Sequence, residues 1–411
     1  MNTAPIDDSI REQFPLLMNY PNLAYLDNAA STQKPLQVLT AMDNYYRNSN
    51  ANVHRALYSL AERSTAAFED ARSTVQRWLR AETPREVIFT RGTTEALNLL
   101  AWSLSELLVE EGDIILVSTL EHHSNFVPWQ QAAARKGAEL VLIPVLEDST
   151  LNLDFLDTLE RDGRSERVKI VSLVHVSNAF GTVNPVREVS KWCKKRDIPL
   201  VLDAAQSVQH LPEEAMSSGA DFLAFSAHKI YGPLGCGVLW GREKWLERMP
   251  PWQSGGEMIS SVKLERSTWN ELPYKFEAGT PNPAAAVGLA AALGWIAETG
   301  MERLETRAKE LENHAFQRLS SLSGITLYGP SQPKRRRGVF SFNIEGVHSH
   351  DAAQFLDTQG IAIRSGHHCA QPAMRCMGIP STARASLAPY NTLSDINRLI
   401  DAILKAKEYF K

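Results

Sequence analysis

Residues 198–229 read IPLVLDAAQSVQHLPEEAMSSGADFLAFSAHK, and they decide the fold because they hold two short strands of the same kind. The runs Ile198–Asp203 and Asp221–Ser226 are apolar at both odd and even positions, rather than at alternate positions. A strand has this pattern when both faces of its sheet are buried, as in parallel sheets covered by helices on both sides. The stretch therefore predicts a sheet with helices above and below it.

The same pattern extends outward along the chain. Short β-branched runs at 86–90, 113–118, 168–174 and 236–240 alternate with longer helical patterns. Such alternation is typical of βαβ units and of a mostly parallel sheet. The fold class is therefore α/β, with a mainly parallel mixed sheet sandwiched by helices.

The pattern changes after the turn-rich segment 279–283. A long helical stretch over about 284–320 comes first, and helices at about 350–359 and 393–409 follow. Short strands are predicted at 338–344, 361–364 and 382–387. These elements predict a smaller α+β domain, whose boundary with the first domain lies inside or just before the long helix.

Length, charge and cysteine content narrow the class of protein. The 411 residues suffice for two or three domains, and 43 basic against 47 acidic residues give a net charge of −4, which disfavours nucleic acid as a partner. The first 15 residues lack the apolar core of a secretory signal, and the most apolar stretch, 284–297, is too short to cross a bilayer. We therefore expect no membrane partner. The four cysteines are too few for a disulfide framework, so we also expect a cytoplasmic protein; they are Cys193, Cys236, Cys369 and Cys376.

In open α/β sheets, ligands bind at the carboxyl ends of the strands. Thr90–Ala96 follows one predicted strand and opens a helix, so that Gly92, Thr93 and Thr94 lie where backbone N–H groups can bind an anion. The same residues also suit a helix N-terminus that binds nothing. On this motif alone both interpretations stay open.

Asp203 and Lys229 end two other strand regions. Either residue alone could form a structural ion pair, but a lysine among apolar strands can also lose its charge and act as a Schiff-base amine. With the anion site, the two supply what pyridoxal phosphate requires: an amine for the aldehyde, a carboxylate for the pyridinium nitrogen and a cradle for the phosphate. We therefore expect pyridoxal 5′-phosphate as cofactor.

Two loops carry further candidate groups. Adjacent histidines such as His122 and His123 point to different sides of a helix or strand and cannot both bind one metal ion, so no metal site is expected. The imidazole of His122 could instead lie against the cofactor ring. Cys369 lies in the loop Arg364–Pro372, whose arginine and histidines favour the reactive thiolate. An inert buried cysteine is the alternative, and it fits Cys193, Cys236 and Cys376 better.

These motifs resemble those of the class V aminotransferase-like pyridoxal phosphate enzymes and, within them, the SufS-type (group II) cysteine desulfurases. The most specific match is the short loop Arg364-Ser-Gly-His-His-Cys369, because group I enzymes have a longer, serine-rich loop around their cysteine. Other matching motifs lie at 26–30, 53–55, 91–95, 121–125, 175–178, 203–206, 226–229 and 276–280. The resemblance implies a pyridoxal phosphate (PLP)-dependent transferase of fold type I. Its large cofactor domain would span 20–285, and its small domain, with the cysteine loop, would combine 1–19 and 286–411.

The resemblance also implies a role for each matching position. Lys229 would bind the cofactor aldehyde, Asp203 the pyridine nitrogen and Gln206 the phenolic oxygen. His122 would stack on the ring and assist proton transfer, and Cys369 would be the nucleophile. The phosphate would be held by Thr93, Thr94, Ser226 and His228, with Thr280 arriving from the second subunit of a homodimer. The substrate carboxylate would meet Asn178 and Arg384, while Arg364 and His54 would line the entrance.

The implied reaction converts L-cysteine to L-alanine and leaves the sulfur as a persulfide on Cys369. A SufE- or SufU-like acceptor would then take the sulfur for iron–sulfur cluster assembly. Three alternatives stay open: a selenocysteine lyase, an aminotransferase or kynureninase-like hydrolase that would not need Cys369, and an inactive scaffold. Ala205 and Ala227 depart from the family, which commonly has glycine there, and segment 254–259 resembles a family hairpin contributed across the dimer.

Overall fold

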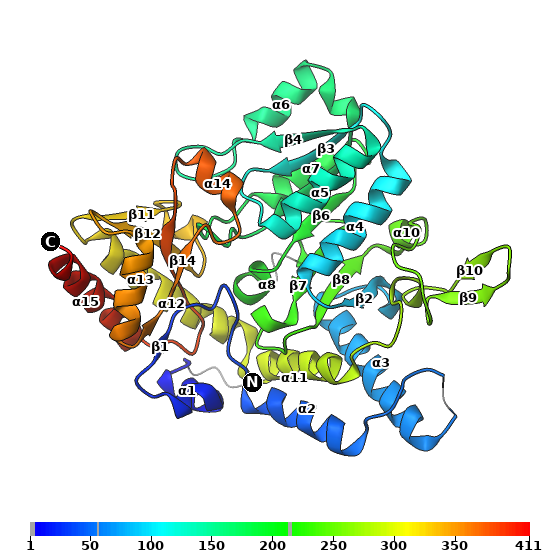
Figure 1. The fold of residues 1–411 in the computed structure, drawn as a ribbon, viewed down its shortest axis with the longest axis horizontal. Helices are drawn as coiled ribbons and strands as arrows, with labels where there is room; N and C mark the ends of the chain where they lie inside the picture. The colour runs from blue at the N-terminus through cyan, green and yellow to red at the C-terminus, as the bar shows by residue number, and fades with distance from the viewer. Residues whose placement is uncertain (1–4, 56, 213–215) are drawn as a thin grey trace.

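A seven-stranded sheet forms the centre of the larger part of the molecule (Figure 1). The computed structural model describes residues 5–55, 57–212 and 216–411. The strand order is β2-β8-β7-β6-β5-β3-β4, and among the described strands of this sheet only β8 runs against its neighbours. The strands are β2 (Val87–Thr90), β3 (Ile114–Ser118), β4 (Glu139–Ile143), β5 (Val168–Val174), β6 (Leu200–Asp203), β7 (Phe222–Ser226) and β8 (Gly237–Gly241).

Successive residues of the central strands belong to two different apolar cores. Leu200 and Leu202 of β6 pack into the core on one face, and Val201 packs into the core on the other. Residues of β3 alternate in the same way, Ile114 with Leu116 and Ile115 with Val117. The prediction that both faces of the sheet are buried is therefore confirmed.

Helices cover both faces of the sheet. One core takes in α4 (Thr93–Leu108) and α5 (His123–Lys136), and the other takes in α7 (Val186–Lys194) and α11 (Pro283–Thr299). Helices α2 (Leu36–Asn48) and α3 (Ser59–Leu79) pack against α11 at one side of the molecule (Figure 1). Shorter helices complete this part: α1 (Pro15–Asn19), α6 (Asp154–Arg161), α8 (Ser207–His210) and α10 (Glu243–Leu246).

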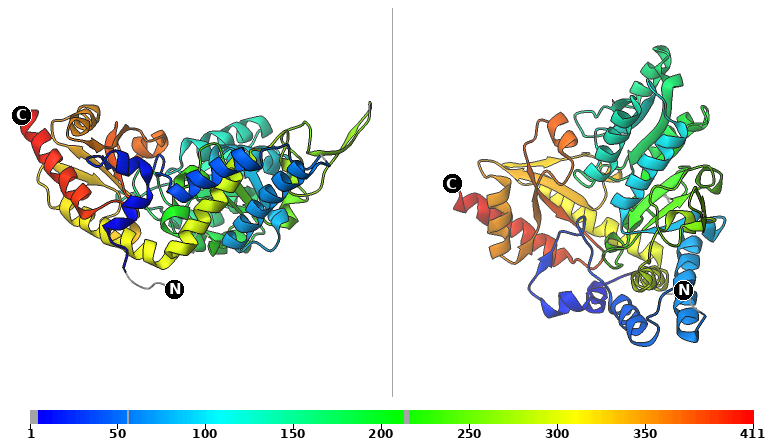
Figure 2. Two further views of the ribbon diagram at one scale, coloured as in Figure 1. Left: turned by 90° about the horizontal axis from the view of Figure 1, so that it is seen from below. Right: turned by 45° about the vertical axis from the view of Figure 1, so that its right-hand side comes forward.

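A second, antiparallel sheet of four strands builds the smaller part. Its order is β11-β12-β15-β14, with β11 (Ile325–Tyr328), β12 (Val339–Ile344), β14 (Arg364–Gly366) and β15 (Thr382–Ser386). Three longer helices and one short helix accompany it: α12 (Met301–Ser320), α13 (Ser349–Thr358), α15 (Leu393–Tyr409) and α14 (Gln371–Cys376). Figure 2 shows this part at one end of the molecule and the seven-stranded sheet at the other.

The N-terminal segment also reaches the smaller part. Strand β1 (Ala24–Tyr25) pairs in parallel with β13 (Ile361–Ala362), and Asp27 forms a bridge to Ser386 at the end of β15. Ala24 and Leu26 accordingly lie in the apolar core of the smaller part. The domain limits predicted at 20–285, 1–19 and 286–411 stay a prediction.

The long helical pattern over 284–320 corresponds to two helices, not one. α11 ends at Thr299, α12 begins at Met301, and the two axes bend by 82°. Gly300 between them has φ +94°, a conformation that costs little only for glycine. The predicted single helix is therefore wrong at this point, because one glycine turns the chain from the larger to the smaller part.

Two features lie outside the predicted pattern. Strand β4 is an edge strand with mixed burial that was not predicted, although Leu140, Val141, Leu142 and Ile143 are all apolar. The hairpin of β9 (Ile259–Val262) and β10 (Ser267–Trp269) projects from the molecule, with Leu264 fully exposed (Figure 2). Within 5–55, 57–212 and 216–411, no single helix is both long and apolar enough to span a bilayer, and α11 and α12 meet that test only together, as a bent pair.

Candidate active site

The predicted site residues converge on one cavity at the carboxyl ends of the central strands. Its volume is about 200 Å³. It lies where β5, β6 and β7 end and where α4 begins, and we call it the Lys229 cavity. Eleven of the predicted residues line it: Thr93, Thr94, His122, Asn178, Asp203, Gln206, Ser226, His228, Lys229, Arg364 and Arg384.

Lys229 and Asp203 bring an amine and a carboxylate to neighbouring strand ends. Asp203 closes β6 and is 2% exposed, and it accepts a hydrogen bond from the Ala205 N–H. Burial raises the pKa of Asp203, while that N–H and the Lys229 charge oppose the rise. Burial lowers the pKa of Lys229 to about 8, although Asp203 acts in the opposite direction. The amine is therefore partly neutral near neutral pH, as a Schiff-base lysine must be.

His122 presents a neutral imidazole to the same cavity. Burial, with a smaller contribution from the Lys229 charge, lowers the pKa of His122 to about 3. The Ser124 N–H donates to Nδ1 of this ring over 3.0 Å, so the ring proton must be on Nε2. A neutral ring with a fixed tautomer can lie against an aromatic ligand or carry a proton at Nε2.

The phosphate cradle predicted at 90–96 has the geometry of an anion site. Thr93 and Thr94 are the first residues of α4, a 16-residue helix whose first N–H groups lack acceptors within the helix. Ser226 Oγ accepts a hydrogen bond from the Thr93 N–H and lies 2.8 Å from Thr93 Oγ1. A Cβ on Gly92 would come within 3.1 Å of that Oγ, so glycine keeps the cradle open.

Arg384 and Asn178 form the wall nearest to the smaller part. Arg384, on β15, is 1% exposed and donates to the Asn178 carbonyl and to Asp27 Oδ1, both at 2.9 Å. Asn178 Nδ2 in turn donates to the His368 carbonyl. These contacts join the cysteine loop to the carboxyl edge of the central sheet.

Cys369 lies at the rim rather than among the residues that line the cavity. Its Sγ is 3.7 Å from Arg364 Nη2, and Arg364 does line the cavity. His368 and Cys369 have φ values of +53° and +56°, in the left-handed region that non-glycine residues seldom adopt. Such strain persists when surrounding contacts hold it, and here the His123 N–H donates to the Cys369 carbonyl over 2.7 Å.

Several buried polar atoms around the cavity have no hydrogen-bond partner within the described part of the chain. They are Asn178 Oδ1, Gln206 Oε1, His228 Nδ1 and Arg384 Nε. Unpaired buried polar atoms are costly, so a polar ligand at this site would relieve them. With the amine, the carboxylate, the neutral imidazole and the anion cradle, these atoms fit pyridoxal phosphate.

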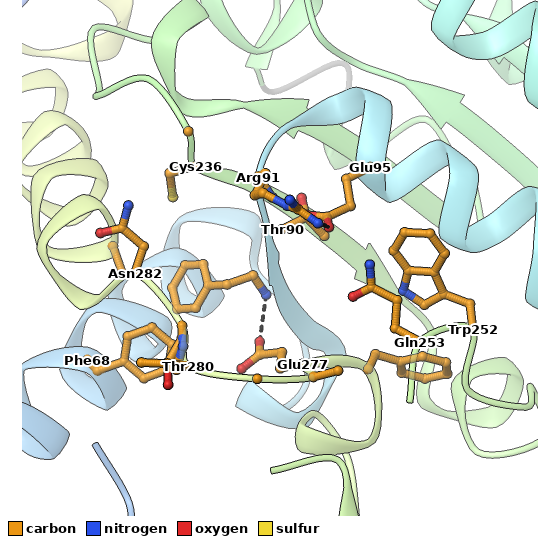
Figure 3. Close-up of a pocket in the computed structure, with 17 residues that line it drawn as sticks. Phe68, Thr90, Arg91, Glu95, Cys236, Trp252, Gln253, Glu277, Thr280 and Asn282 are labelled. Carbon is orange, nitrogen blue, oxygen red and sulfur yellow. Dashed lines mark hydrogen bonds and ion pairs between the residues drawn. The ribbon is translucent and has the colours of Figure 1, made fainter. Parts of the chain in front are cut away.

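Two predicted residues, Thr280 and His54, are not brought to the Lys229 cavity. Thr280 lines a separate cavity of about 570 Å³, together with Phe68, Arg91 and Glu277 (Figure 3), and we call it the Thr280 cavity. His54 has φ +69°, and its Nε2 is 2.9 Å from Glu69 Oε1. Both residues therefore need a partner subunit if they are to reach a Lys229 cavity.

Sequence reasoning missed three residues that position the site. Asp27 forms an ion pair with Arg384, and its position in the motif 26–30 could have indicated a role at the site. His123 accepts at Nε2 from the Gln371 N–H, which ties the cysteine loop to α5. Glu121 is buried and accepts from the Val174 N–H and from Asn125 Nδ2, and burial raises its pKa to about 8.

Comparisons with known proteins show the family of this chain. The model of the family described as aminotransferase class-V matches residues 24–399. A probable cysteine desulfurase from Halalkalibacterium halodurans is 46% identical over 404 residues, which cover 98% of both chains.

Two solved structures are also similar. The apo cysteine desulfurase from Thermococcus onnurineus NA1 has a TM-score of 0.93 at 37% identity, and all of both chains is covered. The cysteine desulfurase CsdA from Escherichia coli, in an S-sulfonic acid form, has a TM-score of 0.88 at 36% identity over 99% of this chain and 100% of its own. With the geometry of the Lys229 cavity, these matches identify the chain as a member of the aminotransferase class-V family, in the branch that contains the cysteine desulfurases.

Proposed function

We propose that this protein is a pyridoxal phosphate-dependent cysteine desulfurase, which converts L-cysteine to L-alanine and keeps the sulfur as a persulfide on Cys369. One observation supports this most strongly: a cavity built around Lys229 and Asp203 has a cysteine at its rim, on a strained loop hydrogen-bonded to the cavity wall. An aminotransferase or a hydrolase has no need of that cysteine. Relatives named as probable cysteine desulfurases, identical at 43–46% over nearly the full length, support the same reaction.

The residues of the cavity would divide the cofactor contacts. Lys229 would hold the aldehyde carbon, Asp203 the ring nitrogen and Gln206 the phenolic oxygen, with His122 against the ring. Thr93, Thr94, Ser226 and His228 would hold the phosphate at the start of α4. When bound, pyridoxal phosphate supplies an electron sink next to the substrate Cα, which acidifies the Cα proton and weakens the Cβ–Sγ bond.

The remaining chemistry belongs to the side chains. Arg384 and Asn178 would bind the substrate carboxylate, and the buried Arg384 Nε is a donor without a partner in the described chain. Lys229 would move the Cα proton. The Cys369 thiolate would attack the substrate sulfur, so that a new S–S bond forms while the Cβ–Sγ bond breaks. The carbon product then gains a proton at Cβ and leaves as L-alanine.

A homodimer belongs to the same proposal. Thr280 and His54 lie away from the Lys229 cavity of their own chain, which supports their delivery to the cavity of a second copy. The exposed hairpin β9–β10 would reach across in the same way. A cytosolic location and a SufE- or SufU-like acceptor fit an exposed persulfide, which reducing surroundings and direct transfer would protect.

The decisive test is an assay for alanine formed from L-cysteine, with and without such an acceptor protein and alongside selenocysteine. We expect one alanine per sulfur transferred and a rate that rises when the acceptor is added. A high rate on selenocysteine that the acceptor leaves unchanged, with little alanine from cysteine, would favour the selenocysteine lyase. A protein that binds the cofactor but forms no alanine from either substrate would contradict both.

The pH dependence of cofactor capture gives a separate prediction. Only the neutral amine of Lys229 can add to an aldehyde, and its pKa is lowered to about 8. Below that pH the neutral fraction, and therefore the capture rate, should rise about tenfold per pH unit, and above it the rate should level off. Stopped-flow absorbance of apoprotein mixed with cofactor measures this rate. A rate that keeps rising to about pH 10 would show an ordinary lysine pKa instead.

A further inference from the structure

Arg72 on α3 is a buried cation in which every N–H group has an acceptor. Its side chain is 1% exposed. Nε donates to Glu69 Oε2 over 2.9 Å, Nη1 to the Val87 carbonyl and to Glu277 Oε1 over 2.8 and 2.6 Å, and Nη2 to Glu277 Oε2 and Glu69 Oε1 over 2.9 and 3.3 Å. These five hydrogen bonds use all the donors of a guanidinium. The geometry of three separate segments is thereby fixed around one group.

Aromatic rings complete the surroundings of this cation. The Arg72 guanidinium carbon lies 5.1 Å from the centre of the Phe68 ring and 4.9 Å from that of Phe89. Burial alone would lower the pKa of Arg72, but Glu277 and Glu69 more than offset it and raise that pKa. Breaking a buried pair leaves an uncompensated charge, so the segments cannot separate cheaply.

Each segment that Arg72 binds either carries or contacts a residue with a role in the proposed reaction. Val87 and Phe89 belong to β2, which runs into the phosphate cradle at Gly92 and Thr93. Glu277 lies three residues before Thr280, and it also accepts from the Phe89 N–H over 2.7 Å (Figure 3). Glu69 reaches His54 Nε2 over 2.9 Å.

Arg72 lies behind the Thr280 cavity rather than the Lys229 cavity. Phe68, Phe89 and Glu277, which touch it, all line the Thr280 cavity. The cradle segment contributes to both cavities: Thr90 and Arg91 to the Thr280 cavity, and Thr93 and Thr94 to the Lys229 cavity. A shift of the Arg72 cluster would therefore move the cradle of its own chain and the Thr280 offered to a second chain.

We propose that Arg72 is a positioning residue for two active sites at once: it sets the phosphate cradle in its own subunit and the Thr280 and His54 segments that serve the partner's site. The inference rests on the proposed function, because it takes pyridoxal phosphate as ligand and a homodimer as the working unit. Arg72 touches neither cofactor nor substrate. Its effect is carried by Glu277, Glu69 and the backbone of β2.

The first experiment compares two buried arginines. Arg72→Lys keeps the charge but cannot supply five donors. Arg336→Lys alters a buried arginine whose side chain, among the described residues, donates to the carbonyls of Tyr328, Pro330 and Val339. Loaded protein is dialysed while the loss of visible absorbance reports release of pyridoxal phosphate. We expect release about tenfold faster or more in Arg72→Lys, since small misplacements of binding groups have effects of this size or larger. Arg336→Lys should release the cofactor at the wild-type rate, even though its melting temperature should also be lower than that of the wild type.

Mixed dimers then decide whether one guanidinium serves two sites. In the first dimer, one subunit carries Arg72→Lys and the other carries Lys229→Ala, so the only covalent site belongs to the Arg72 variant. In the second dimer, both changes are in one subunit, so the only covalent site belongs to the subunit with intact Arg72. Fast release from both dimers supports the proposal. Fast release from neither, or from the first alone, overturns it.

Stability and desulfuration are measured on the same proteins. If Arg72→Lys does not fold, Glu277→Gln takes its place in the experiment, because it removes the bidentate carboxylate while keeping the side-chain size. The release rates expected for it are the same. If the rate of cofactor release increases in proportion to the loss of melting temperature in both the Arg72 and the Arg336 variant, then Arg72 stabilises the fold and does not position the site. Failure of the wild-type protein to form alanine from cysteine would instead contradict the proposed function, whatever the release rates show.

Discussion

Replacing Cys369 with alanine should lower alanine formation from L-cysteine by about a thousandfold or more, because the atom that accepts the substrate sulfur is removed. The visible absorbance of bound cofactor should stay unchanged. The cysteine loop is held through backbone carbonyls, by the His123 N–H at Cys369 and by Asn178 at His368, so loss of the thiol leaves its anchors in place. Alanine also meets the same left-handed backbone at φ +56° that cysteine does, so the change adds no new strain.

Cys376→Ala is the matched control for this variant. Cys376, at the end of α14 and seven positions after Cys369, is exposed and not buried as predicted, and it lines neither of the two cavities. Its removal should leave the rate within about twofold, as for surface substitutions away from special features. Mass spectrometry after a single turnover should find one extra sulfur on Cys369 in the wild-type protein and in Cys376→Ala. Undiminished alanine formation by Cys369→Ala would remove the persulfide from the mechanism.

Replacing Lys229 with alanine should have an effect of similar size, about a thousandfold or more, because in the proposed reaction this one residue would both anchor the cofactor and move the Cα proton. Borohydride reduction followed by peptide mapping should label Lys229 in the wild-type protein and no lysine in the variant. The cradle and Asp203 remain, so the variant should still bind pyridoxal phosphate reversibly. Equilibrium dialysis measures that remaining affinity.

Lys229→Arg separates the amine from the charge. Arginine keeps a cation beside Asp203 but cannot become neutral in the range where Lys229 does, so this variant should be as inactive as Lys229→Ala. Recovery of activity by arginine would show that only the positive charge matters. Borohydride labelling of a different lysine in the wild-type protein would place the cofactor elsewhere.

The fold of the larger part was predictable because its strands are buried on both faces. The run Val168–Val174 is apolar at both odd and even positions apart from Lys169 and Ser172, which favours burial on both faces, and the structure has that strand at the predicted bounds. The site followed from the same logic, since Asp203 and Lys229 are polar groups directly after apolar strands. A sheet with parallel strands brings such strand ends together, however far apart they lie in the sequence.

What the sequence did not predict depends on partners that are distant along the chain. The glutamates on either side of Arg72 lie 3 and 205 positions away, and no local pattern marks the second one. A basic run such as 334–337 is usually solvated, yet Arg336 is 3% exposed and donates to three backbone carbonyls. Gly300 inside an otherwise helical pattern likewise gave no indication of an 82° turn.

The pairing of β1 with β13 has a consequence for biosynthesis. Ala29 and Ala30, just after β1, line the Lys229 cavity, and so do Arg364, His368 and Arg384 near the C-terminus. A chain still on the ribosome can form the central sheet with Lys229 and Asp203, but it cannot close the cavity until its last strands emerge. Under the proposed function, tight binding of the cofactor would therefore require the finished chain, and a product truncated before Cys369 would have neither a closed site nor the cysteine that would carry sulfur.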